Sequence, residues 1–157
     1  MSEVDTSHLP EPLAQLVDDF HSVGPQDRLQ ILLELSDGLP GLPDRYAGRL
    51  DQMEQVHECQ SPLFLAVEVE PAADGQASED RVVRLYFDAP PEAPTTRGFA
   101  GILHEGLDGR SVAEVLDVPD DAPFRFGLSE AVSPLRMRGM VAMLARIKRQ
   151  VRLRTAH

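Results

Sequence analysis

The sequence has a single cysteine, no tryptophan and an aromatic fraction of only 5% among its 157 residues. One cysteine, Cys59, cannot form an internal disulfide, so nothing in the composition points to an oxidising compartment. No apolar run approaches the roughly 20 residues that a membrane-spanning helix needs. The segment Met1 to Pro12 has neither the basic start nor the apolar stretch of a secretory signal. We therefore expect a cytoplasmic protein without a membrane partner.

Basic residues are few relative to acidic ones, 15 against 26, which gives a net charge of −11. Such a surface repels phosphates, so we expect no nucleic-acid partner. From Ser133 onward, however, the chain carries only basic charges. These residues are Arg136, Arg138, Arg146, Lys148, Arg149, Arg152 and Arg154. The segment is either a solvated helix face that complements an acidic body or a docking surface for a partner.

The N-terminal part predicts a flexible tail over residues 1–11 and then two short helices. Apolar residues recur at helical spacing in both segments. The stripes are Leu13, Leu16, Val17 and Phe20 in the first helix, and Leu29, Leu32 and Leu33 in the second. Pro25 suits the first turn of the second helix, which should end near Gly38.

The middle of the chain changes to the period of a β-strand. Residues 63–70 and 81–88 read as two strands joined by the polar segment 72–80, and residues 52–58 could supply a third. Helical spacing returns after the proline-rich segment 89–94.

Three helices are expected in the C-terminal half. Thr95 or Thr96 could cap the first, Ser111 and Glu114 form a capping box for the second, and Ser133-Pro134 opens the longest. The buried stripe of the last helix should be Met137, Met140, Val141, Leu144, Ile147 and Val151. Helices, then strands, then helices predict an α+β fold with a small antiparallel sheet packed by helices.

Cys59 lies between two predicted strands, in the sequence Glu58-Cys59-Gln60-Ser61-Pro62. Connections between strands run at the surface, so the thiol is expected to be reachable. The structural alternative is that Cys59 behaves as a small buried hydrophobic residue, as free cysteines commonly do. The residues that follow it suit a turn better than a core strand.

Several thiol chemistries need further groups that a single cysteine cannot provide. A dithiol redox enzyme needs a second cysteine, and a structural zinc or iron–sulfur site needs about four ligands. A cysteine hydrolase needs a histidine beside the sulfur, and His57 lies two residues away on the same side of an extended segment. Nothing in the sequence identifies an oxyanion hole for such an enzyme.

Sulfur relay asks for less, because one accessible thiolate can take the terminal sulfur of a donor persulfide. The negative charge of Glu58 should disfavour ionisation of the neighbouring thiol. A carrier of this kind would leave most of the activation to its partner.

The motifs resemble the SufE family over about residues 13–153. Val56-x-x-Cys59-Gln60-Ser61, followed by Leu63-Phe64-Leu65, resembles the sulfur-acceptor loop of that family. Further matches occur in the same order along the chain. They are Leu39-Pro40, Arg97-Gly98-Phe99, Leu107-Asp108-Gly109-Arg110-Ser111, Leu128-Ser129 and Ser133-Pro134-x-Arg136-x-x-Gly139-Met140.

The resemblance implies a single SufE-like domain over residues 12–157 with a fold shared with IscU-type scaffolds. It also implies that Cys59 accepts sulfur from a SufS-like cysteine desulfurase, stimulates that enzyme, and passes the sulfur to the SufBCD scaffold for iron–sulfur cluster assembly. The pyridoxal phosphate would belong to the desulfurase, and this chain would hold no cofactor or metal. Arg136 matches a family residue near the acceptor loop and the partner interface.

The chain departs from the family pattern at Glu58, where many members have glycine, so its loop is expected to swing out less freely. A non-catalytic module that regulates a desulfurase through its surface remains an alternative function, and a stand-alone thiol enzyme is a third. Another sulfurtransferase, such as a rhodanese-like protein, could also be the donor. Cys59→Ser separates a carrier from a binding module, because only a carrier should lose stimulation of the donor.

Overall fold

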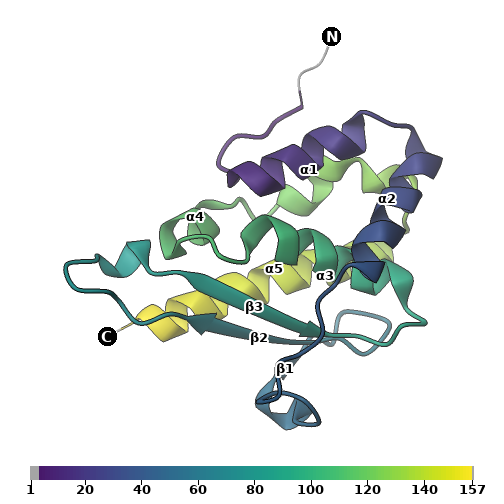
Figure 1. Cartoon of the computed structure of the whole chain (residues 1–157). Coiled ribbons are helices and arrows are strands. Elements are labelled where there is room, and N and C mark those ends of the chain that lie inside the picture. The colour runs from purple at the N-terminus through teal and green to yellow at the C-terminus, as the bar shows by residue number, and fades with distance from the viewer. Residues whose placement is uncertain (1–3, 157) are drawn as a thin grey trace.

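The amphipathic segments of the chain assemble around a small sheet, as the computed structural model of residues 4–156 shows (Figure 1). The helices are α1 (Glu11–His21), α2 (Pro25–Asp37), α3 (Pro94–Leu107), α4 (Val112–Asp117) and α5 (Pro134–Thr155). The strands are β1 (Glu54–Gln55), β2 (Phe64–Val69) and β3 (Val83–Asp88). The architecture is α+β, which confirms the predicted fold class.

The sheet is antiparallel throughout, with the strand order β1-β2-β3. Leu65 pairs with Phe87 and Val67 with Leu85, so that buried apolar residues meet across the two longer strands. The predicted strand at residues 52–58 is confirmed only in its centre, because β1 has two residues and follows a 3-10 turn at Leu50–Gln52.

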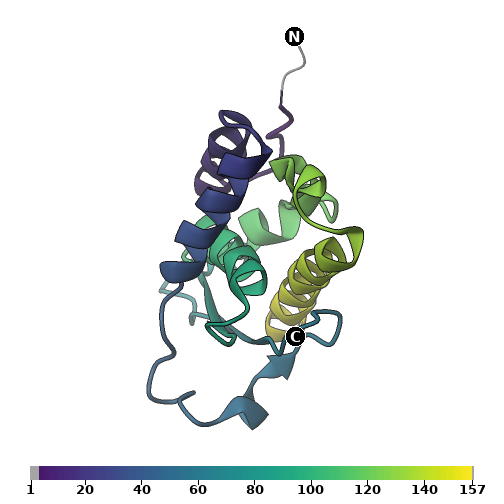
Figure 2. The ribbon, with the colours of Figure 1, turned by 90° about the vertical axis from the view of Figure 1, so that its right-hand side faces the viewer.

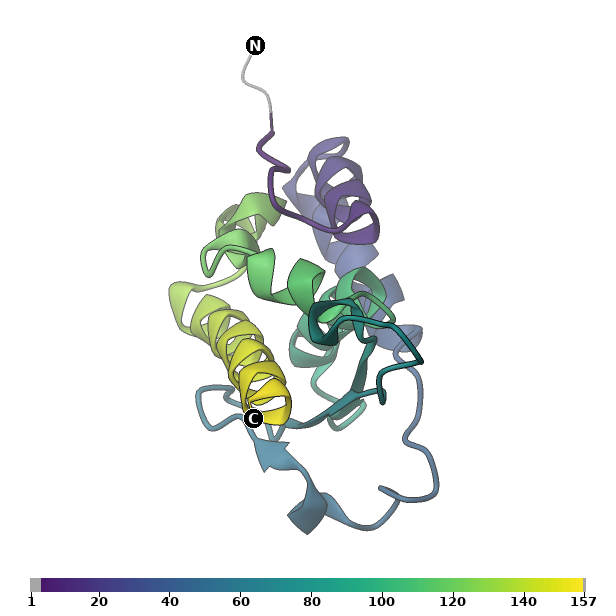
Figure 3. The same cartoon turned by 90° about the vertical axis from the view of Figure 1, so that its left-hand side faces the viewer.

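The helices gather on one face of the sheet and form the core with it (Figure 3). The long α5 packs on β2 and on α3, and α2 packs along α3. Most of the predicted stripe of α5 is buried, but Val141 is only half-buried. The capping box of Ser111 and Glu114 is confirmed, as is the start of α5 at Ser133-Pro134, where the Ser133 side chain caps the helix.

Two local predictions are wrong. In α2, Leu29 and Leu33 are 38% and 42% exposed, so that of the three leucines of the predicted stripe only Leu32 is buried. In α3 neither threonine caps the helix, because the helix begins earlier, at Pro94, and Thr96 is buried inside it. The fixed φ of proline suits a first helical residue, and here it sets the start in place of a side-chain cap.

The opposite face of the sheet is partly covered by the long connection between α2 and β1 (Figure 2). Arg45 Nη2 donates to Glu68 Oε1 at 2.8 Å, and the Tyr46 hydroxyl donates to Glu68 Oε2 at 2.6 Å. Arg45 also donates to the hydroxyl of Tyr86 at 2.8 Å. These polar contacts join the connection to the outward-facing side chains of β2 and β3.

The predicted flexible tail, residues 1–11, falls partly outside the described residues. Arg125 Nη1 donates to the carbonyl oxygen of Ser7 at 2.8 Å, Pro10 is buried, and Glu11 is already the first residue of α1. Within residues 4–156, no helix combines the length and the apolar character needed to cross a membrane.

Candidate functional site

Cys59 lies in a tight turn between β1 and β2. The amide of Val56 donates to the carbonyl oxygen of Leu63 at 2.8 Å, which continues the strand pairing to the base of the turn. The amide of Cys59 donates to the carbonyl oxygen of Val56 at 3.2 Å and closes the turn. Val56 and Leu63 are buried at its base, whereas Glu58 and Gln60 on either side of the cysteine are exposed. The cysteine is therefore carried by a surface connection, as the sequence predicted.

The Cys59 side chain turns inward and is only partly accessible. It is a free thiol that packs against the core, and the turn lies beside α5 (Figures 2 and 3). A Cβ atom placed on Gly139 of α5 would lie 3.0 Å from Cys59 Sγ, closer than ordinary van der Waals contact. Gly139 therefore provides the space in which the sulfur rests, and we call this contact the sulfur seat.

The surroundings of the thiol keep it protonated. Burial raises the pKa of Cys59 to about 11, and the negative charge of Glu58 adds to this effect. The positive charge of Arg146 acts in the opposite direction without overcoming them. In the resting protein the sulfur is therefore not an activated nucleophile, in agreement with the expected effect of Glu58.

Arg146 of α5 connects the Cys59 turn to the helix. Its Nη2 donates to Glu58 Oε1 at 2.6 Å and its Nη1 donates to Glu54 Oε2 at 2.6 Å. Glu54 also accepts hydrogen bonds from Arg149 and Gln150. Burial opposes the ionisation of Glu54, but these hydrogen bonds outweigh it and lower its pKa. The sequence analysis did not find this cluster, because its members are about 90 positions apart.

Arg136, the second predicted site residue, lies in the first turn of α5, three residues before Gly139. Its backbone amide donates to Ser133 Oγ at 3.3 Å, while its side chain is exposed. Among residues 4–156 this side chain forms no ion pair. The structure thus places Arg136 one helical turn from the sulfur seat without a contact to the sulfur.

The remaining basic residues of α5 divide into two groups. Arg146, Lys148 and Arg149 pair with acidic residues of the body, and the buried Lys148 donates to Asp120 Oδ1 at 2.8 Å. Arg138, Arg152 and Arg154 are exposed. The basic segment therefore complements the acidic body in part and leaves positive charge on the surface in part.

His57, the candidate base for a thiol enzyme, is exposed on the turn and makes no side-chain hydrogen bond within the described part of the chain. The thiol therefore has no base oriented by a third group there. No group of three or more His, Cys, Asp or Glu residues in the described part of the chain is arranged to hold a metal ion.

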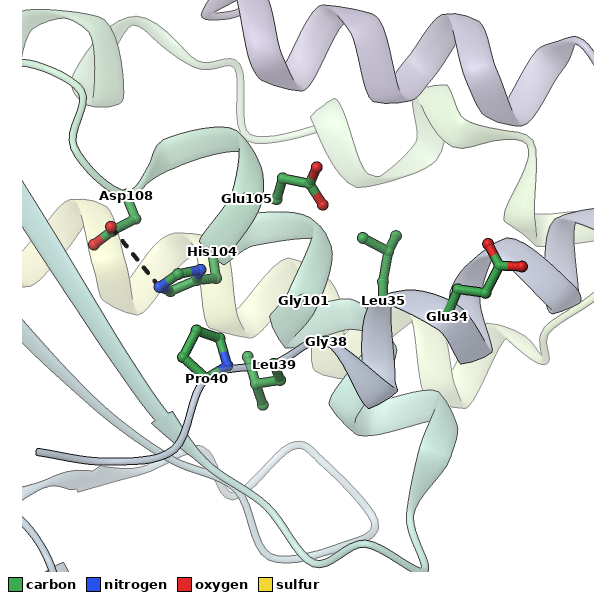
Figure 4. Close-up of a pocket in the computed structure, with 9 residues that line it drawn as sticks. All are labelled: Glu34, Leu35, Gly38, Leu39, Pro40, Gly101, His104, Glu105 and Asp108. Atoms are coloured by element: carbon green, nitrogen blue, oxygen red, sulfur yellow. Dashed lines mark ion pairs between the residues drawn. The ribbon is translucent and has the colours of Figure 1, made fainter.

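A separate hollow of about 370 Å³ lies where α2 and α3 end, away from Cys59 (Figure 4). His104 Nε2 lies 3.8 Å from Asp108 Oδ2 inside it. Asp108 already accepts a hydrogen bond from the amide of Leu85 at 2.8 Å and pairs with Arg84 at 3.4 Å. The carboxylate thus joins the end of α3 to β3, and Cys59 is not among the residues that line the hollow.

Comparisons with known proteins agree with this geometry. Residues 14–151 match the SufE family, described as an Fe-S metabolism associated domain. An uncharacterised SufE-like protein of Mycobacterium tuberculosis H37Rv is 54% identical over 144 residues, which are 92% of this chain and 94% of that protein. SufE-like protein 1 of Arabidopsis thaliana, chloroplastic/mitochondrial, is 28% identical over 137 residues, 87% of this chain and 33% of that protein.

A solved structure shows the same fold. The solution structure of a hypothetical protein from Thermus thermophilus aligns with a TM-score of 0.79 at 40% identity, and the alignment covers 95% of this chain and 99% of that one. The family match, the relatives and the fold agree along almost the whole chain. This chain therefore belongs to the SufE family, which places it in iron–sulfur metabolism.

Proposed function

We propose that the protein is a sulfur carrier that takes persulfide sulfur from a SufS-like cysteine desulfurase onto Cys59 and delivers it to the SufBCD scaffold. The observation that carries this proposal is the position of Cys59, the only cysteine of the chain, on a surface turn whose sequence resembles the acceptor loop of the family. No second thiol is needed for a carrier, because the sulfur leaves as it arrived, by exchange between sulfurs.

The two proteins together account for every bond, electron pair and proton of the transfer step. The Cys59 thiolate attacks the terminal sulfur of the donor persulfide, and a bond forms between Cys59 Sγ and that sulfur. The sulfur–sulfur bond of the donor breaks, and its electron pair remains on the donor cysteine, which can take up the proton that Cys59 released. No external oxidant or reductant takes part. Because the resting thiol is protonated, the donor site has to favour the thiolate when the two proteins meet.

Arg136 is proposed to contact the donor. It is exposed, it lies one helical turn from the sulfur seat, and a cation at this position can attract an anionic persulfide or an acidic rim around it. Arg136→Ala should raise the concentration of carrier at which desulfurase stimulation is half-maximal. The alkylation rate of Cys59 in the isolated protein should stay unchanged.

The direct test is incubation with a cysteine desulfurase and cysteine, followed by intact mass analysis. We expect a mass gain of one sulfur atom that reductant removes and that Cys59→Ser does not acquire. Stimulation of the desulfurase should disappear in the same variant. If no mass gain is found with several desulfurases, the protein is not a carrier of this kind.

A regulatory binding module is the second candidate, and the half-buried, protonated state of Cys59 is the observation that favours it. Such a module would change desulfurase turnover through its surface and would use Cys59 only for packing. Stimulation that survives in Cys59→Ser would establish this function in place of sulfur transfer.

A further inference from the structure

The ion pairs of Arg146 hold both ends of the segment that leads into Cys59. Glu54 lies at the start of β1, and Glu58 directly precedes the cysteine. One guanidinium group donates to both carboxylates, with N–O distances of 2.6 Å on each side. The strand and the turn are thereby fastened to a single side chain of α5.

The two attachments differ in strength. The Glu54 side chain is 20% exposed and accepts hydrogen bonds from Arg149 and Gln150 as well as from Arg146. The Glu58 side chain is 48% exposed, and Arg146 is its sole ion-pair partner among residues 4–156. Exposed ion pairs are weak, whereas a carboxylate with several donors is held firmly. The attachment next to the cysteine is therefore the one that opens first.

The same helix holds the turn at a second point. Gly139 and Arg146 are seven residues apart on α5, about two helical turns, so they lie on one face of the helix. The sulfur rests over Gly139, and the neighbouring carboxylate is bound by Arg146. Arg146 Nε is buried without a hydrogen-bond partner in the described structure, so the contacts through Nη1 and Nη2 fix the position of the guanidinium group.

We propose that Arg146 is a positioning residue of the sulfur carrier, whose ion pair with Glu58 keeps the Cys59 turn closed on α5 until that pair is broken. The proposal rests on the proposed function, since it assigns Cys59 as the residue that must be exposed. Opening at Glu58 leaves the pairing of Glu54 intact, so β1 stays in the sheet while the turn swings. A sulfur donor that competes for Glu58 or for Arg146 would release the cysteine.

The test compares Glu58→Gln, Arg146→Met and the double variant by hydrogen–deuterium exchange of the amides of residues 57–61. Arg146→Met keeps the apolar stem and leaves Glu54 with Arg149 and Gln150. Each single variant should exchange about two- to fivefold faster in the turn, the range that a partly exposed ion pair supports. The double variant should exchange no faster than Arg146→Met, because that change already removes the ion pair that Glu58→Gln removes.

The opposite charges of Glu58 and Arg146 make it possible to distinguish an effect of charge on Cys59 from an effect of the ion pair on the position of the turn. Glu58 raises and Arg146 lowers the pKa of Cys59, so charge alone moves the thiol titration in opposite directions in the two variants. If the ion pair positions the turn, amide exchange of residues 57–61 should instead become faster in both Glu58→Gln and Arg146→Met. Asp51→Asn removes an exposed acid of the 3-10 turn before β1 that has no ion-pair partner in residues 4–156, and it should leave exchange unchanged.

Unchanged exchange in Glu58→Gln, or opposite changes in the two single variants, would overturn the proposal. These measurements use no donor protein, so their outcome is separate from that of the sulfur-transfer assay. A turn that opens in Glu58→Gln while the parent protein never gains sulfur would refute the carrier and leave only the ion pair that holds the turn closed. The reverse result would refute the positioning role alone.

Discussion

At the scale of single residues, the burial and the charges around one sulfur set the acidity of the only thiol of the chain. Cys59 packs at the sulfur seat on Gly139 beside the carboxylate of Glu58, and burial and that negative charge both raise its pKa and favour its protonated form. The position of Cys59 on a turn could be predicted from the residues that follow it. The ion pair between Glu58 and Arg146 could not, because 88 positions separate its partners and no local pattern connects them.

The alkylation rate of Cys59 should depend on pH as expected for a poorly acidic thiol. With a pKa of about 11, against an ordinary value of 9.0, the reactive thiolate is scarce at neutral pH. We expect the rate with iodoacetamide to rise continuously from pH 8 through pH 10. A plateau reached by pH 8 would show that the thiol is activated in the isolated protein.

Gly139→Ala should displace the sulfur from its seat without unfolding the protein. The added Cβ would lie 3.0 Å from Cys59 Sγ, and the surface turn can move away from it. Alanine favours a helix by about 1 kcal/mol over glycine, which offsets the lost contact in the free energy of unfolding. Alkylation at pH 8 should be faster, measured with the urea midpoint as a check on stability.

Gly41→Ala is the matched control, since nothing lies within 4 Å of the position of its Cβ. This variant should change neither the alkylation rate nor the stability. If Gly139→Ala behaved in the same way as the control, Gly139 would not be the sulfur seat.

At the scale of elements, the periodic patterns in the sequence predicted the helices and strands that bury one face in the core. The alternation of β3 and the stripe of α5 could be read from the sequence because both elements bury one face. The pattern of α2 misled because Leu29 and Leu33 are apolar residues at the surface, where spacing does not reveal burial. The brevity of β1 was also unpredictable, since the turn hydrogen bonds around Cys59 set its end.

The contact between α2 and α3 depends on the absence of a side chain at Gly101. A Cβ there would lie 2.6 Å from the carbonyl oxygen of Leu35, and backbone cannot move aside as a flexible side chain can. Gly101→Ala should therefore lower the free energy of unfolding by about 1–3 kcal/mol. Urea denaturation would measure this change, and a loss no larger than that of Gly41→Ala would contradict the close approach of the two helices.

At the scale of the whole molecule, an acidic body is tied together by arginine side chains. Ion pairs of this kind join α5 to the Cys59 turn and the connection after α2 to the sheet. Composition predicted the charge imbalance. Only the tertiary structure shows which basic residues are paired with acids and which, such as Arg136, are exposed without an ion pair among residues 4–156.

The stability of the protein should fall in acid. Burial opposes the ionisation of Glu54, Glu68 and Glu114, but hydrogen bonds from their neighbours outweigh it, and a hydrogen bond from Arg146 acts on Glu58. All four pKa values lie below the ordinary 4.5, so the unfolded chain binds more protons in acid than the folded one does. This stabilisation is present above pH 4.5 and is lost as the pH falls through the folded-state values.

The urea midpoint should therefore drop between pH 6 and pH 3.5. Glu68→Gln should weaken this dependence, because it removes the carboxylate that pairs with Arg45. Asp51→Asn, an exposed acid without such a pair in the described chain, should preserve the dependence. A midpoint that is constant or rises in acid would contradict the stabilising role of these ion pairs.

The sulfur seat also bears on how the protein tolerates peroxide and oxidised glutathione. Both reagents act on exposed thiolates, and damage beyond the sulfenic acid is largely irreversible. A protonated sulfur folded against a helix is a poor target for either. A chain with only one cysteine has no second thiol to repair such a lesion, so the shielding of Cys59 preserves the only thiol that the protein has.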